Sequence, residues 1–256
     1  MSQIHFCTFA SSPNFTNTGK VLVDEAEKSG YFNSIICYDQ YFVAKTYPEH
    51  LSFFTEKFYK WQLRGFGYWL WKPLVILSRL SELPLGDILF YADGGCAINT
   101  NENAQKNFQM WVHDIESHST HRISFQMAHP EEKFTKGSLL AYMNRTGDQT
   151  GQYSATIQGY KHTPENIAFV KRWIEIATMD NYHFITDEPS TILNADSFVD
   201  HRHDQSIYSL LIKELGTETH PDYYPNMVDY PIVAARRCIR MQHMDVTGIS
   251  RAWEII

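Results

Sequence analysis

The segment from Gly86 to Gly95 combines a short apolar run with an acid and a pair of glycines, in the order Gly-Asp-Ile-Leu-Phe-Tyr-Ala-Asp-Gly-Gly. A buried strand over 88–92 would place Asp93 at the carboxyl edge of a sheet, where α/β proteins bind ligands. A carboxylate there can hold a hard divalent ion that grips a diphosphate, and Gly94 would let a bulky ligand approach the backbone. The alternative is that Asp93 only caps a turn, because Asp-Gly is a common turn pair.

A second segment places two glycines in an aromatic loop ahead of a predicted helix, in the order Arg64-Gly-Phe-Gly-Tyr-Trp-Leu-Trp-Lys-Pro73. Its cations are Arg64 and Lys72. Lys72 falls in the first turn of the helix, where the helix dipole does not favour a positive charge. A bound anion or a facing carboxylate would explain it. In the alternative interpretation the tryptophans belong to the core and Lys72 is solvated.

A third segment, Asp200-His-Arg-His-Asp-Gln-Ser206, opens another predicted helix with four ionisable groups and an amide. His201, His203 and Asp204 could ligate a metal ion, but neighbouring residues point to different faces of a helix, so only one or two would share a site. Asp204 and Gln205 also suit a helix start, because carboxylates are favoured there.

The elements that must position these residues alternate in type along the chain. Apolar runs with β-favouring residues predict strands over 4–9, 34–38, 88–92, 122–127 and 153–160. Apolar spacing and capping residues predict helices over 21–28, 51–59, 69–83, 101–117, 137–143, 164–177 and 203–215. This alternation indicates an α/β fold of Rossmann type, with a mixed, mainly parallel sheet flanked by helices.

The composition excludes several classes of protein. The 256 residues include 22 Lys and Arg against 29 Asp and Glu, and a formal charge of -7 disfavours a general nucleic-acid binder. The four cysteines form no CxxC pair, which disfavours a disulfide framework or a structural zinc site and favours a reducing compartment. We find neither a signal peptide nor a transmembrane segment and expect a soluble, cytoplasmic protein. Its Tyr- and Arg-rich tail could still dock at the inner face of a membrane.

Taken together, three segments resemble nucleotide-sugar-dependent glycosyltransferases with the GT-A fold, of the type found in bacterial surface-polysaccharide clusters and some large viruses. The segments are Gly67–Pro73, Gly86–Cys96 and His201–Leu211, with weaker similarity at Phe134–Lys136 and Gln152–Gly159. The resemblance spans most of the chain and keeps the order of its parts. It implies a single glycosyltransferase domain over 1–256 with a GT-A-like sheet, a nucleotide-binding half over 1–100, and an acceptor half with the C-terminal tail over 101–256.

The resemblance also implies a nucleoside diphosphate sugar as the donor and a glycan or lipid-linked acceptor, with polysaccharide biosynthesis as the setting. The donor would be bound by Thr8, Phe9, Ala10, Arg64, Lys72, Asp93, Gly94, Gly95, Arg236 and Arg237. Asp93 matches the first acid of the Asp-x-Asp motif of such enzymes, but Gly95 stands in place of the second. Mn²⁺ or Mg²⁺ would then have one carboxylate, and His243 or the diphosphate oxygens could complete its ligand shell. Alternatively, Lys72 with Arg236 or Arg237 neutralises the diphosphate without an ion.

Catalysis is assigned by the same resemblance to Asp204, Gln205 and His203. In an inverting mechanism Asp204 is the general base, whereas in a retaining one Gln205 or Asp204 stabilises an oxocarbenium-like state. Two rival expectations remain. Gly95 favours a binding domain that has lost catalysis. A metal-dependent phosphohydrolase could use Asp93 with the histidines, although such enzymes usually gather more ligands around two ions.

Overall fold

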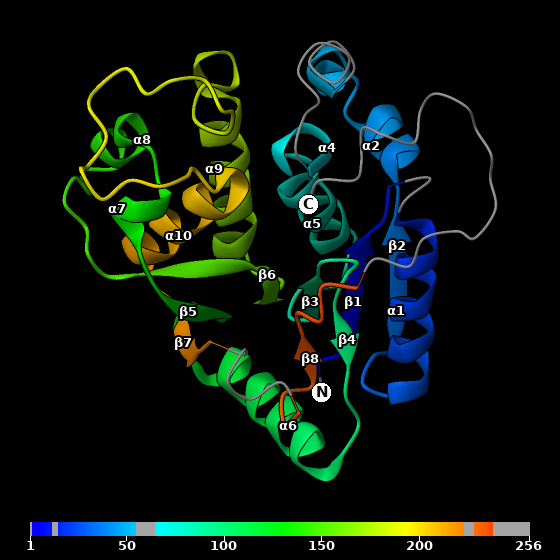
Figure 1. Ribbon diagram of the computed structural model, residues 1–256. Helices are drawn as coiled ribbons and strands as arrows, with labels where there is room; N and C mark the ends of the chain where they lie inside the picture. Colours follow the sequence, from blue (N-terminus) through cyan, green and yellow to red (C-terminus); the bar gives the residue numbers. More distant parts are fainter. Residues whose placement is uncertain (1, 12–14, 55–64, 223–227, 238–256) are drawn as a thin grey trace.

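The computed structural model describes residues 2–11, 15–54, 65–222 and 228–237. Six strands form one sheet in the order β2-β1-β3-β6-β5-β7 (Figure 1). In that order they are Ser34–Tyr38, Ile4–Phe9, Ile88–Ala92, Gly151–Lys161, Arg122–Pro130 and Glu218–Pro221. Three of the five neighbouring pairs are parallel, and β6 is antiparallel to both of its neighbours. The predicted α/β class with a mixed, mainly parallel sheet is confirmed.

A second, two-stranded sheet pairs β4 (Ala97–Ile98) with β8 (Ile232–Val233) in antiparallel fashion. It fastens the last described part of the chain beside the loop that follows β3. This pairing brings the residues up to Arg237 next to the Asp93 turn.

The helices predicted over 69–83, 101–117, 137–143, 164–177 and 203–215 are present, whereas the first helix begins at Thr16 instead of residue 21, and the short helices over 40–46, 48–50, 65–68 and 131–134 were not predicted. The helices are α1 (Thr16–Ser29), α2 (Gln40–Thr46), the 3₁₀ helix η1 (Pro48–His50), α4 (Gly65–Tyr68), α5 (Trp71–Glu82), α6 (Glu102–Ser117), α7 (Glu131–Phe134), α8 (Gly137–Tyr142), α9 (Pro164–Tyr182) and α10 (His203–Leu215). Their capping residues act as expected, because the side chains of Asn101 and Thr163 each accept a backbone N–H in the first turn of α6 and α9. Of the helix predicted over 51–59, only 51–54 lies within the described residues, and it is helical.

The period of two in β3 divides its side chains between two cores. Leu89 and Tyr91 pack on one face of the sheet with α5, α9 and α10, whereas Phe90 packs on the other face with α1 and α6. Figure 1 shows α9 and α10 above the sheet and α6 below it. Tyr91 therefore lies on the same face as the starts of α5 and α10, the two helices that carry predicted site residues.

The loop before α5 differs from the prediction. Residues 65–69 all have positive φ and form a left-handed turn, so the helix begins at Trp71 instead of Trp69. This conformation costs L-residues about 1–2 kcal/mol each. Glycine is required at Gly65, where a Cβ would lie 2.2 Å from the Trp69 ring, and the Gly65 carbonyl accepts a bond from the Trp71 indole. Contacts of the Tyr68 and Trp69 rings with His203 of α10 stabilise the turn. Local sequence patterns do not predict such contacts.

None of the described helices is both long enough and apolar enough to cross a membrane.

Candidate active site

Three predicted site residues meet at one point on the carboxyl side of β3. The Lys72 ammonium, in the first turn of α5, lies 3.2 Å from Asp93 Oδ1 and 2.7 Å from Asp204 Oδ2. The hydroxyl of Tyr91 donates to Asp93 Oδ1 at 2.6 Å. We call these four residues the Lys72 cluster. It joins the first turn of α5, the end of β3 and the first turn of α10.

Burial strengthens the electrostatic interactions between the charged side chains of this cluster. Lys72 and Asp204 are each 3% exposed. Burial alone would lower the pKa of Lys72, but the two carboxylates outweigh it and raise that pKa. Burial also raises the pKa of Asp204 to about 6, even though the Lys72 ammonium opposes the shift. The interpretation of Lys72 as a solvated side chain is therefore wrong, and the expected facing carboxylate is present twice.

Asp93 connects the buried centre to solvent. Its side chain is 29% exposed, and no described residue contacts Oδ2. Its backbone also closes the turn after β3, since the Cys96 N–H donates to the Asp93 carbonyl at 2.9 Å. The turn interpretation is compatible with the ligand interpretation, because the Asp93 backbone forms the turn and the Oδ2 oxygen of its side chain makes no hydrogen bond or ion pair with a described residue.

The described residues of the Lys72 cluster would supply few ligands to a divalent cation. Among the residues that the structure describes, no group of three or more His, Cys, Asp or Glu side chains could hold a metal ion. Oδ1 of Asp93 already faces an ammonium, which leaves the Oδ2 oxygen as its one hard ligand. His243 lies outside the described residues. The residues present fit Mn²⁺ or Mg²⁺ only as a cation held mainly by a bound diphosphate.

The end of β1 lies against the Asp93 turn. A Cβ added at Gly94 would lie 2.9 Å from the Phe9 carbonyl oxygen and 3.9 Å from Thr8 Oγ1. That Thr8 hydroxyl is buried and has no hydrogen-bond partner among the described residues. The Phe9 ring stacks on Trp71 at a centroid distance of 3.9 Å. Buried polar groups nearly always have partners, but Thr8 is 0% exposed, so its place in the donor site stays a prediction. Ala10 instead packs against α1.

The two glycines have a packing role in the structure. The Phe9 carbonyl occupies the space that a side chain at Gly94 would need, and the Arg237 carbonyl lies 3.1 Å from a Cβ built at Gly95. The predicted close contact of these glycines with a ligand stays a prediction. The absence of a second acid at Gly95 is explained by the chain segment that crosses it.

The structure pairs one of the predicted arginines of the tail, Arg237, with a residue outside the Lys72 cluster. Arg237 makes a two-bond ion pair with Glu25, one bond being 2.7 Å, and also donates to the Cys96 carbonyl. Its charge therefore holds α1 to the turn after β3. Arg236 is exposed, and Arg64 lies outside the described residues.

The histidines at the start of α10 face main-chain carbonyls. Nε2 of His201 lies 2.8 Å from the Phe184 carbonyl oxygen, and Nδ1 of His203 lies 2.9 Å from that of Ile185. Burial lowers the pKa of His201 well below its usual range, so the ring is neutral. His203 also stacks on Trp69 at 5.5 Å. The metal cluster that a phosphohydrolase would need from these histidines is not formed by the described residues.

Gln205 is held from both ends of its amide. Its Nε2 donates to Gln152 Oε1 at 2.8 Å, and its Oε1 accepts the Ala155 N–H at 3.3 Å. The next residue of β6, Thr156, accepts the N–H of Asp93. The Gln205 amide therefore lies on β6 beside the end of β3. Gln152 was not predicted as its partner, and the available signals were its position directly before the predicted strand over 153–160 and at the start of the segment Gln152–Gly159.

No model of a known protein family matches the chain, and no curated protein sequence matches it either. The chain is similar to several solved structures at TM-scores below 0.5. One is a glycosyltransferase involved in the glycosylation of the major capsid of PBCV-1, at 10% identity over 90% of this chain and 93% of that chain, with a TM-score of 0.49. Another is mouse xyloside xylosyltransferase 1, at 10% identity over 86% of this chain and 85% of that chain, with a TM-score of 0.46. A third is the WbbM bifunctional glycosyltransferase, at 9% identity over 85% of this chain and 38% of that chain, with a TM-score of 0.49.

Proposed function

We propose that this chain is a glycosyltransferase that moves a sugar from a nucleoside diphosphate sugar to a hydroxyl group of a glycan or a lipid-linked acceptor. The observation that carries the proposal is the Lys72 cluster. Three segments that resemble motifs of GT-A transferases, far apart in sequence, meet in one buried ionic centre with a single oxygen turned outward. The centre lies at the carboxyl edge of the parallel strands, where α/β folds bind nucleotides.

In this proposal the donor lies along the ends of β1 and β3. The unpartnered Thr8 hydroxyl is placed to bond a ribose or base group, and Asp93 Oδ2 is placed to accept from a ribose hydroxyl or to ligate a cation. Phe9, stacked on Trp71, forms an apolar wall beside them. Thr8 and Phe9 lie in β1 and Asp93 directly follows β3, so their backbone is already ordered and binding of the donor would cost little conformational entropy.

The charge of the diphosphate needs compensation that the Lys72 cluster does not supply alone. With both acids ionised, the one ammonium leaves the cluster with a formal charge of -1. Mn²⁺ or Mg²⁺ bound with the donor would neutralise the departing diphosphate, held by Asp93 Oδ2 and, as a further expectation, by His243. Arg236 is a second source of positive charge from the tail. Such stabilisation of the leaving group is the largest requirement of sugar transfer.

The reaction breaks the bond between the anomeric carbon and the diphosphate oxygen and forms a bond to the acceptor oxygen. The acceptor proton must leave at the same time. Asp204, whose pKa is raised to about 6, is ionised at neutral pH. Its side chain is 5% exposed and pairs with Lys72, so it takes that proton in an inverting reaction only once a bound acceptor reaches its carboxylate. In a retaining reaction, Gln205 or Asp204 stabilises the cationic sugar and the departing phosphate takes the proton. His203 would line this site through its ring.

The proposal is tested by a thermal-shift screen with the diphosphates of uridine, guanosine, thymidine and adenosine and their sugars, with and without Mn²⁺. A ligand at 100 times its Kd adds about 2.7 kcal/mol of stability, which is a shift of roughly 5–10 °C for a chain of this size. We expect one base to raise Tm and its sugar to be consumed, with the anomer of the product, read by NMR, deciding between inversion and retention. No shift with any nucleotide would overturn the proposal.

A further inference from the structure

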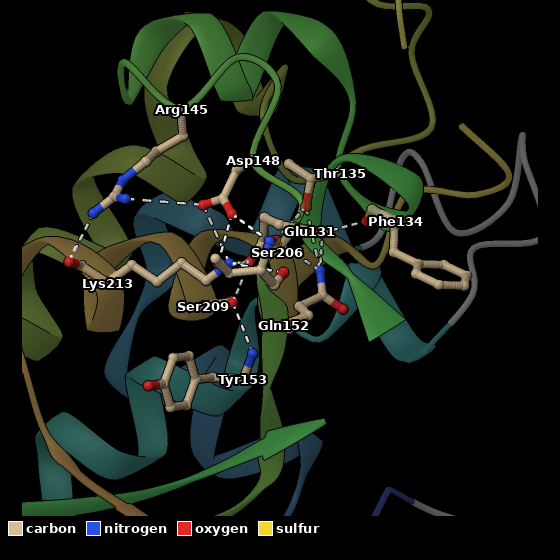
Figure 2. A network of polar contacts seen from close by, with 12 residues as sticks. Glu131, Phe134, Thr135, Arg145, Asp148, Gln152, Tyr153, Ser206, Ser209 and Lys213 are labelled. Carbon is tan, nitrogen blue, oxygen red and sulfur yellow. Dashed lines mark hydrogen bonds and ion pairs between the residues drawn. The ribbon is translucent and has the colours of Figure 1, made fainter. Parts of the chain in front are cut away.

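A second buried network lies where β6 packs against α7 and α10, and it includes Gln152, the partner of Gln205 (Figure 2). Its centre is Glu131, which is fully buried. Oε1 of Glu131 accepts Thr135 Oγ1 at 2.7 Å and Gln152 Nε2 at 3.0 Å. Its Oε2 faces the Lys213 ammonium at 2.9 Å and accepts the Ser209 hydroxyl. We call these five residues the Glu131 network.

The carboxylate of Glu131 gives this network a direction. A carboxylate only accepts hydrogen bonds, so the Gln152 amide must turn its Nε2 toward Glu131. Its Oε1 is then left facing Gln205, whose Nε2 donates to it at 2.8 Å. The Gln205 Oε1 in turn meets the Ala155 N–H. A reversed Gln152, which has no exposed surface, would set two NH₂ groups against each other, so one orientation is strongly favoured.

We propose that Glu131 is a positioning residue that fixes, through Gln152, the orientation of the Gln205 carboxamide beside the Lys72 cluster. The consequence for turnover rests on the proposed function, in which Gln205 lies near the reacting sugar carbon. Gln205 is half-buried, and its Oε1 accepts the N–H of Ala155. The carbonyl of the next residue, Thr156, accepts the Asp93 N–H, so the end of the relay lies beside the turn that carries Asp93. The buried charge of Glu131 is balanced by Lys213, which also pairs with Asp148 at 3.2 Å.

The first arm of the test does not depend on activity. Glu131→Gln replaces the carboxylate by an amide that can donate or accept, so Gln152 can adopt either orientation, and a reversed Gln152 turns its Nε2 toward the Gln205 Nε2, which the Ala155 N–H keeps in place. We expect the side-chain amide signals of Gln205, assigned in ¹H–¹⁵N spectra by their loss in Gln205→Ala, to move or double. Ser209→Ala is the control: it removes the bond to Oε2 and the bond that Ser209 accepts from the Tyr153 N–H, and it leaves the Oε1 bond to Gln152 in place. Gln205 signals that stay in place in Glu131→Gln, or move equally in both variants, would overturn the proposal.

The second arm measures turnover of the donor found in the screen. Gln152→Leu removes the relay while keeping the side chain's size. We expect it to lower kcat by about tenfold to a hundredfold, with KM for the donor changed less than threefold. In a Gln205→Ala background the same change should lower kcat by less than about twofold, since the residue acts through Gln205. Equal losses in both backgrounds would overturn the relay. If the wild type consumes no donor, the proposed function fails and the spectra alone decide this inference.

Discussion

The Lys72 cluster and the Glu131 network are built from similar groups but differ in charge balance. Each holds a lysine between two carboxylates, since Lys213 contacts Glu131 and Asp148 as Lys72 contacts Asp93 and Asp204. In the Glu131 network, hydroxyl groups and an amide fill the remaining acceptor sites, and Arg145 lies 3.9 Å from Asp148 as a second cation. In the Lys72 cluster, the Tyr91 hydroxyl donates to Asp93, and among the described residues no second cation pairs with Asp93 or Asp204.

This difference teaches where a ligand belongs. Glu131 and Lys213 of the Glu131 network are buried and opposite in charge, and the neighbouring Asp148 also faces Arg145, whose side chain is 38% exposed, so these charges are matched without a ligand. The Lys72 cluster is left with a formal charge of -1 and one carboxylate, that of Asp93, 29% exposed at the sheet edge. Removing one partner of a buried ion pair is costly, at about 3–5 kcal/mol, so both clusters support the fold. Only the Lys72 cluster also has a partly exposed carboxylate, that of Asp93, with which a substrate could interact.

The largest expected difference between the Lys72 cluster and the Glu131 network is the effect of replacing the lysine of each. Lys72→Met leaves two carboxylates without their ammonium and should lower kcat/KM by about 10³-fold or more. Lys213→Met should cost a similar free energy of unfolding, about 3 kcal/mol, but lower kcat/KM by roughly tenfold only. Turnover and urea unfolding of the two variants measure both effects. Equal losses of activity would show that the two clusters do not differ in function.

Within the Lys72 cluster, Asp204→Asn separates chemistry from binding. The amide keeps the size of the side chain and cannot take a proton, so turnover should fall by about 10²-fold or more. Donor affinity, measured by calorimetry, should change less than about threefold because the donor contacts proposed for Thr8 and Asp93 remain. If affinity and turnover fell by the same factor, Asp204 would be a binding group and not a general base.

The pH dependence sharpens this assignment. Because burial raises the pKa of Asp204 to about 6, the side chain is protonated below that pH and cannot accept a proton. We expect kcat/KM to rise with pH through about 6 and to level off above 7. The folded-state pKa lies above the usual 3.8, so the contribution of Asp204 to stability falls as pH rises from about 4 to 6. A flat rate profile between pH 5 and 7 would argue against Asp204 as the base.

The smallest expected effect concerns Thr8. Its hydroxyl has no partner among the described residues, so Thr8→Val should change the free energy of unfolding by less than about 0.5 kcal/mol. Donor affinity should fall by about fivefold, which corresponds to one lost hydrogen bond of about 1 kcal/mol. Denaturation and calorimetry on the same samples measure the two quantities. Unchanged affinity would remove Thr8 from the donor site.

Much of the fold was predictable because its signals are local. The strands over 4–9, 34–38 and 88–92 have the predicted ends, and α10 begins at His203 and stops before Gly216. The apolar run before Asp93 and the capping residues carry that information in neighbouring positions. The left-handed turn over 65–69 was not predictable, since it depends on ring contacts with distant residues.

The site was predictable as a set of candidates and not as a set of contacts. Lys72, Asp93 and Asp204 were each singled out from local chemistry, but their pairing is created by the packing of α5 and α10 on one face of the sheet. Glu131 was missed because it follows His-Pro at a strand end and resembles a solvated helix start. Arg237 was assigned to the donor, whereas the structure directs it to Glu25.

The central claim is that a nucleoside diphosphate sugar binds at Asp93. Calorimetric titration of the donor identified in the screen, in the presence of Mn²⁺, into wild-type protein and Asp93→Ala tests it most directly. We predict that the substitution lowers affinity at least about 100-fold while circular dichroism shows an unchanged fold. Equal affinity of the two proteins would contradict the claim and place the donor elsewhere.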